Sequence, residues 1–164
     1  MTGEKLNLNA ECNANKQMNE TFCAFDLPDD YYIGYFDGAS RGNPGLAGAG
    51  AWISDANNLN IWENSISLGK KTNNEAEYLA LIDLLRELYK RGIKRAEIRG
   101  DSKLVIEQMS NRWKVREPRL IELCRQAKLL SAEMFIKYQW IPREQNTLAD
   151  SLSNKAIDNN DNLL

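Results

Sequence analysis

The stretch from Tyr31 to Gly45, with the sequence YYIGYFDGASRGNPG, constrains the fold of this chain more than any other. A run of Tyr, Ile and Phe is typical of a buried strand, whereas the residues that follow it, rich in glycine and ending in Asn-Pro-Gly, are typical of a turn. The pattern therefore predicts a strand over 31–37 and a turn that begins after Asp37. Because sites in open α/β sheets gather at the carboxyl ends of strands, Asp37 is a candidate site residue.

Periodicity and turn residues predict the other elements. Two strands, over 48–54 and 60–68, complete an antiparallel meander with the first strand and lead into a basic loop over 69–72. The strongest helix prediction then covers 73–91. It is followed by a strand over 93–100, helices over 102–109 and 118–133, a strand over 134–141 and a helix over 147–157. This order predicts an α/β fold whose mixed five-stranded sheet carries helices on both faces.

Charge divides the 164 residues into three parts. Residues 1–30 are predicted to be a polar extension without regular structure, and their net charge is −4. Residues 31–157 form the predicted domain and hold 19 basic and 15 acidic residues, a surplus that phosphate binding favours. Residues 158–164 are predicted to be a polar tail. Since no apolar run approaches the roughly 18 residues of a membrane span, we expect a cytoplasmic protein that makes no membrane contact. We also expect it to be a monomer.

Residue types limit the chemistry that is open to this chain. It contains no histidine, and its three cysteines lack the paired spacing of a zinc site. Any metal site must then use carboxylate oxygens, which are ligands that suit hard ions such as Mg²⁺ and Mn²⁺.

Helix phase distinguishes Glu77 from the other acidic residues. On a helix over 73–91, Glu77 falls among the leucines of the apolar face, whereas Glu75 falls on the polar side. A buried carboxylate is costly unless it is paired or bound to a metal, so Glu77 needs a partner.

Three other acids have structural explanations as well as functional ones. Asp37 precedes glycine, a common turn dipeptide, and Asp101 follows a predicted strand but also precedes a helix that it could cap. Asp150 ends the sequence TLAD, which matches a capping box, and its helix phase predicts a solvated position. For these three residues the two explanations remain open on the residues alone.

Four motifs occur together in one order: DGASRGNPG, TNNEAEY, GDS and PREQNTLAD. From about Tyr31 to Ile157 the sequence thereby resembles the type 1 ribonuclease H family. The resemblance implies an endonuclease that hydrolyses the RNA strand of RNA/DNA hybrids and leaves 5′-phosphate and 3′-hydroxyl ends. It implies two bound Mg²⁺ ions, with Mn²⁺ as the alternative ion, and a two-metal mechanism in which both ions contact the scissile phosphate. The ligands that it implies are Asp37, Glu77, Asp101 and Asp150.

The resemblance also implies substrate contacts. Ser40, Asn43, Asn73 and Asn74 match positions at or near the 2′-hydroxyl groups that distinguish RNA from DNA, and Thr72 matches a pocket for a DNA-strand phosphate. In the basic segment over 112–119, Trp113 and Lys114 are candidates for contact with the DNA strand. Helix capping is the alternative for the two adjacent asparagines, and a solvated turn is the alternative for the basic segment.

One position departs from the family pattern. Trp140 stands where many members have a histidine that is thought to assist the departure of product or metal, which places the chain in a histidine-lacking branch. Arg143 is a candidate for a partial replacement of that histidine, although it could equally be a surface charge. A catalytically silent hybrid-binding module of the same fold is the alternative function. A nucleotide-binding domain is not supported, because the sequence has no Walker A or dinucleotide glycine pattern.

Overall fold

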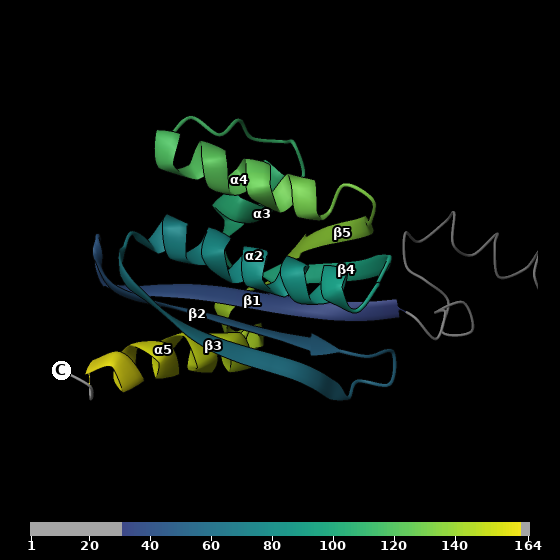
Figure 1. Ribbon diagram of the computed structural model, residues 1–164, viewed down its shortest axis with the longest axis horizontal. Coiled ribbons are helices and arrows are strands. Elements are labelled where there is room, and N and C mark those ends of the chain that lie inside the picture. Colours follow the sequence, from purple (N-terminus) through teal and green to yellow (C-terminus); the bar gives the residue numbers. More distant parts are fainter. Residues whose placement is uncertain (1–30, 162–164) are drawn as a thin grey trace, which may run out of the picture.

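The computed structural model describes residues 31–161, so the predicted extension over 1–30 lies outside the described residues. A five-stranded sheet with the order β3-β2-β1-β4-β5 forms the centre of the molecule (Figure 1). β1 pairs antiparallel with β2 and parallel with β4, and the outer pairs β2–β3 and β4–β5 are antiparallel and parallel respectively. The predicted mixed sheet is therefore confirmed. The strands are β1 (Tyr31–Gly42), β2 (Gly45–Ser54), β3 (Asn60–Lys71), β4 (Arg95–Gly100) and β5 (Phe135–Trp140).

Helices cover both faces of this sheet, as predicted (Figure 1). α2, α3 and α4 lie on one side, with α4 packed over α2, and α5 lies on the other side, against β1, β2 and β3. Among the described residues, none of the helices combines the length and the apolar character that crossing a bilayer requires. The helices are α2 (Asn73–Lys90), α3 (Lys103–Met109), α4 (Pro118–Leu130) and α5 (Thr147–Asp161), and a 3₁₀ turn, η1 (Arg143–Gln145), precedes α5.

The first strand is longer than its sequence predicts. β1 continues through Asp37 to Gly42, and its last residues pair with the start of β2, so the turn itself contains only Asn43 and Pro44. Of the glycines that suggest a turn here, Gly38 is a strand residue beneath α2, whereas Gly42 ends β1 and Gly45 begins β2. The predicted basic loop over 69–72 is also wrong in part, because β3 extends to Lys71 to pair with the start of β2.

The ends of two helices also differ from the prediction. α4 ends at Leu130, and Ser131 follows it with its hydroxyl donating to the carbonyl of Ala127. α5 continues beyond residue 157 into the predicted tail and ends at Asp161. The helix therefore continues past Ile157, where the apolar pattern of the sequence stops. In this last part of α5, Asp158 forms an ion pair of 2.5 Å with Arg41 of β1.

α2 is the buried helix that connects the sheet to the site. Its leucines at 81, 84, 85 and 88 are fully buried between the sheet and α4. The helix begins with a capping box, in which the Thr72 hydroxyl accepts the N–H of Glu75 and the Glu75 carboxylate accepts the N–H of Thr72. Glu77, one turn further on, lies on the buried face that its helix phase predicts.

Candidate active site

Asp37 and Asp101 are brought together by the pairing of two parallel strands. The ladder between β1 and β4 ends with Phe36 opposite Gly100, so the next residue of each chain segment is an aspartate. β4 stops there, whereas β1 continues along β2. Asp37 therefore lies within β1 but level with the carboxyl end of β4. In open α/β sheets, sites form at the carboxyl ends of parallel strands.

Glu77 reaches these two residues because α2 crosses β1 at a glycine. A Cβ atom placed on Gly38 would lie 2.2 Å from the carbonyl carbon of Ala76 and 2.2 Å from the amide nitrogen of Glu77. Only glycine permits so close an approach of helix and strand. The contact sets Glu77 beside Asp37, with Glu77 only 9% exposed and Asp37 only 4% exposed.

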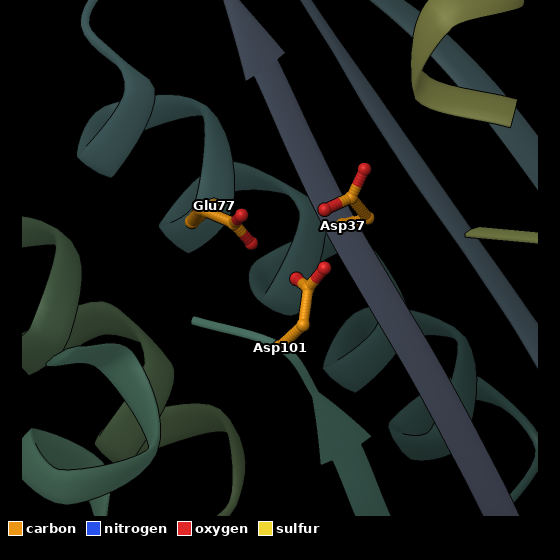
Figure 2. Close-up of side chains that lie close together, drawn as sticks. All are labelled: Asp37, Glu77 and Asp101. Atoms are coloured by element: carbon orange, nitrogen blue, oxygen red, sulfur yellow. The ribbon is translucent and has the colours of Figure 1, made fainter. Parts of the chain in front are cut away.

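The three carboxylates converge on one point (Figure 2). Asp37, Glu77 and Asp101 each offer an oxygen, and these three oxygens all lie within 4.8 Å of one another. Among residues 31–161, the Oε2 atom of Glu77 is buried and has no hydrogen-bond partner. An unpartnered buried carboxylate oxygen beside two other carboxylates is the arrangement that a cation would satisfy.

Burial and mutual repulsion change the acidity of this cluster. Burial, followed by the negative charge of Asp101, raises the pKa of Asp37 to about 7, although a hydrogen bond from Ser153 acts in the opposite direction. Burial, followed by the charges of Asp37 and Asp101, raises the pKa of Glu77 well above its ordinary value. Without a cation the cluster therefore retains protons that exposed carboxylates would lose. A set of oxygen ligands with this much negative charge fits Mg²⁺ or Mn²⁺.

Asp150 lies at the rim of the same site. It lines a pocket of about 550 Å³ together with the three clustered carboxylates, but it falls outside their 4.8 Å group. Its Oδ1 lies 3.4 Å from a guanidinium nitrogen of Arg143 and 3.4 Å from the side-chain nitrogen of Asn154. The side chain of Asp150 is 33% exposed, so it is neither buried nor turned away from the site as a fully solvated residue would be.

Two residues that the sequence did not indicate hold this region together. Ser153 of α5 is fully buried, and its hydroxyl lies 2.8 Å from Oδ2 of Asp37. Asn146, which precedes α5, is 1% exposed and donates from its side chain to the carbonyl of Phe36 at 2.9 Å. A signal for Ser153 exists in the sequence, because a serine on the buried side of an amphipathic helix requires a polar partner.

The predicted RNA-contacting residues lie around the start of α2. Ser40 and Asn73 line the carboxylate pocket. The Ser40 hydroxyl donates to the carbonyl of Lys71 at 2.8 Å, and the side-chain oxygen of Asn43 accepts the N–H of Asn73 at 3.1 Å. The first bond joins β1 to the end of β3, and the second ties the turn between β1 and β2 to the start of α2. Asn74 follows Asn73 in the first turn of α2 and is half-buried.

The other predicted contacts occupy two places. Arg143 lines the pocket with a side chain that is 77% exposed, and Trp140 lines it as well, with its indole N–H donating to the carbonyl of Asp101 at 3.1 Å. Trp113 and Lys114 lie in the segment between α3 and α4, outside the lining of this pocket. Trp113 is 46% exposed there, so its ring is accessible.

Comparison with protein families gives one clear match. The family model described as "Reverse transcriptase-like" covers residues 35–156. The bifunctional protein Rv2228c of Mycobacterium tuberculosis is 48% identical over 125 residues, which make up 74% of this chain and 34% of that protein. This chain thus spans about a third of the length of that relative. Ribonuclease H of Francisella philomiragia is 32% identical over 142 residues and is matched over 90% of its length.

Solved structures extend the likeness to the fold. The crystal structure of RNase H1 from Halobacterium salinarum superposes with a TM-score of 0.76 at 37% identity, over 79% of this chain and 98% of that one. LC11-RNase H1, solved in complex with an RNA/DNA hybrid, superposes with a TM-score of 0.74 at 40% identity, over 78% of this chain and 97% of that one. With this agreement in sequence, sheet order and helix placement, the chain belongs to the type 1 ribonuclease H family.

Proposed function

We propose that residues 31–161 form a metal-dependent endonuclease that hydrolyses the RNA strand of RNA/DNA hybrids. The observation that carries the proposal is the convergence of Asp37, Glu77 and Asp101, with a buried oxygen of Glu77 that has no partner among the described residues. A protein that had lost its activity would have no reason to keep this costly arrangement. LC11-RNase H1, which binds a hybrid, is 40% identical to this chain and gives further support.

We assign the metal-binding role to the three clustered carboxylates, and we assign Asp150 to the rim of the metal site. Two divalent ions bound there would supply the positive charge that makes a bound water acidic and offsets the charge of the scissile phosphate. The three carboxylates come from β1, α2 and the end of β4, so the fold fixes their relative positions before any ion arrives. Mg²⁺ is the ion that we propose, with Mn²⁺ as the alternative.

Other residues of the pocket would position the substrate. Arg143 lies next to Asp150 and brings a positive charge to the exposed side of the pocket, where a phosphate of the RNA strand would enter. Asn73 and Ser40 line the same pocket, where both side chains would meet 2′-hydroxyl groups in the minor groove. We propose that this recognition restricts cleavage to RNA, with 5′-phosphate and 3′-hydroxyl products.

The test uses a hybrid whose RNA and DNA strands carry different 5′ labels, incubated with the full chain and Mg²⁺, Mn²⁺ or EDTA. We expect RNA fragments with either ion, no fragments with EDTA and no cleavage of the DNA strand. An intact RNA strand with both ions would overturn the proposal. Tight binding of the hybrid without cleavage would instead identify a silent binding module.

A pair of variants on one helix tests the site assignment. Glu77→Gln keeps the shape of the side chain but removes the charge that ions require, so we expect cleavage to fall by at least about a thousandfold. Glu75→Gln makes the same chemical change two residues away, where glutamine can still complete the capping box with Thr72. This control should cleave like the unmodified chain. Similar activities in the two variants would refute the role of Glu77.

A further inference from the structure

A row of three residues crosses the sheet beneath α5. Asp37 of β1 is opposite Gly50 of β2, and Gly50 is opposite Ser65 of β3. A Cβ atom on Gly50 would lie 2.4 Å from the carbonyl oxygen of Ala149 and 2.5 Å from the amide nitrogen of Ser153. The backbone of α5 therefore rests directly on Gly50, closer to the sheet than any larger residue would allow.

This close approach brings side chains on either side of Gly50 into contact with α5. On one side, Ser65 donates from its hydroxyl to the carbonyl of Leu152. On the other side, the Ser153 hydroxyl lies 2.8 Å from Oδ2 of Asp37 and 2.8 Å from the carbonyl of Asp150. A hydroxyl has one proton, and an ionised carboxylate is the stronger acceptor of the two. Ser153 thus forms a direct bond from α5 to a carboxylate of the candidate metal site.

The bond acts on the terminal torsion of Asp37, which sets the direction in which each carboxylate oxygen points. The terminal torsion of an aspartate is broad and roughly two-fold, so a carboxylate without partners turns easily about its axis. Figure 2 shows one oxygen of Asp37 turned toward Glu77 and the other turned away from it. A bond that holds Oδ2 toward α5 leaves the remaining oxygen available on the side of Glu77 and Asp101.

We propose that Ser153 is a positioning residue that orients the Asp37 carboxylate for metal binding. It touches no substrate atom in this role and acts only through Asp37. Groups that orient metal-binding side chains affect metal affinity strongly, and their loss commonly costs about 10- to 100-fold. The inference rests on the proposed function in one respect, because it takes Asp37 to be a metal ligand.

The test compares two serines of the same row. Ser153→Ala removes the hydroxyl that binds the carboxylate, whereas Ser65→Ala removes a hydroxyl that binds the Leu152 carbonyl of the same helix. Mn²⁺ alone is titrated into each full-length protein, and the free ion is measured by electron paramagnetic resonance. We expect Mn²⁺ affinity to fall about tenfold in Ser153→Ala and to stay within about twofold of the unmodified chain in Ser65→Ala.

Thermal unfolding in EDTA confirms that both variants fold and compares the loss of packing in each. Equal Mn²⁺ affinities in the two variants would overturn the inference, and so would a complete absence of Mn²⁺ binding by the unmodified chain. Where the hybrid is cleaved, Ser153→Ala should require more Mg²⁺ for half-maximal rate while its KM for the hybrid is unchanged. Mn²⁺ binding without hybrid cleavage would refute the proposed function alone, because the affinity comparison would still decide the role of Ser153.

Discussion

Replacing Asp37 with asparagine should make the metal-free protein more stable above neutral pH while it abolishes cleavage. Asp37 is 4% exposed and packed against two other carboxylates, and burial raises its pKa to about 7. The folded state therefore holds the proton more tightly than the unfolded chain does. The stability of the unmodified protein falls as pH rises from about 4 to about 7, and the full cost of ionisation is present above that range.

The size of the expected stabilisation follows from the pKa shift of Asp37. The pKa rises from its ordinary value of 3.8 to about 7, and each unit corresponds to about 1.4 kcal/mol, which gives an upper limit of about 4 kcal/mol. Asn has nearly the same volume and can still accept a hydrogen bond from Ser153, so Asp37→Asn removes the charge and little else. We expect a gain of about 1 to 4 kcal/mol at pH 8 in EDTA and no gain at pH 4.

Urea unfolding at the two pH values measures this difference directly. Asp158→Asn is the control, because it neutralises an exposed carboxylate of α5 outside the cluster. It removes the exposed ion pair with Arg41, so it should lower the stability slightly or leave it unchanged, and should not raise it. Added Mg²⁺ should stabilise the unmodified chain more than Asp37→Asn and so reduce the gap between them. Equal free energies of unfolding for Asp37→Asn and the unmodified chain at pH 8 in EDTA would refute the electrostatic argument.

Three smaller changes test the surroundings of the cluster. Thr72→Ala removes a capping-box hydroxyl and should lower the free energy of unfolding by about 1 kcal/mol, measured by urea unfolding; no change would show that the cap is redundant. Arg143→Ala removes the positive charge beside Asp150 and should lower kcat about three- to tenfold in the labelled-hybrid assay, whereas an unchanged kcat would make it a surface charge. Trp113→Ala removes an exposed aromatic ring and should raise KM for the hybrid about tenfold with kcat nearly unchanged, and an unaffected KM would exclude the ring from binding.

The elements that the sequence predicts well are those whose signal is local. The apolar face of α2 is contained within one segment, so its phase alone places Glu77 on the buried side. The residue at which β1 ends cannot be predicted from the sequence of that segment alone. Its residues after Asp37 are held by pairing with β2 and covered by α2 at Gly38, and the sequence of the segment shows only glycines that also suit a turn.

The position of Asp150, on the other face of the sheet, also could not be predicted from its own segment. Centring the apolar face of α5 on Leu148 and Leu152 predicts a solvated Asp150. In the structure the buried face also includes Ala149 and Ser153, both fully buried, and this rotation brings Asp150 to the rim of the pocket. The rotation depends on Gly50 of another strand, so a helix examined by itself cannot indicate it.

The central position of β1 also sets the order in which the molecule can assemble. β1, β2 and β3 are consecutive and pair through short connections, whereas β4 must wait for α2 to cross the sheet before it can pair with β1. Contacts between nearby segments form sooner than those that close long loops. We therefore expect Asp37 to take its place with the early hairpins and Asp101 to join it when β4 pairs with β1. A nascent chain would have the strand long before it had a site, because the three carboxylates would meet only once β4 pairs with β1.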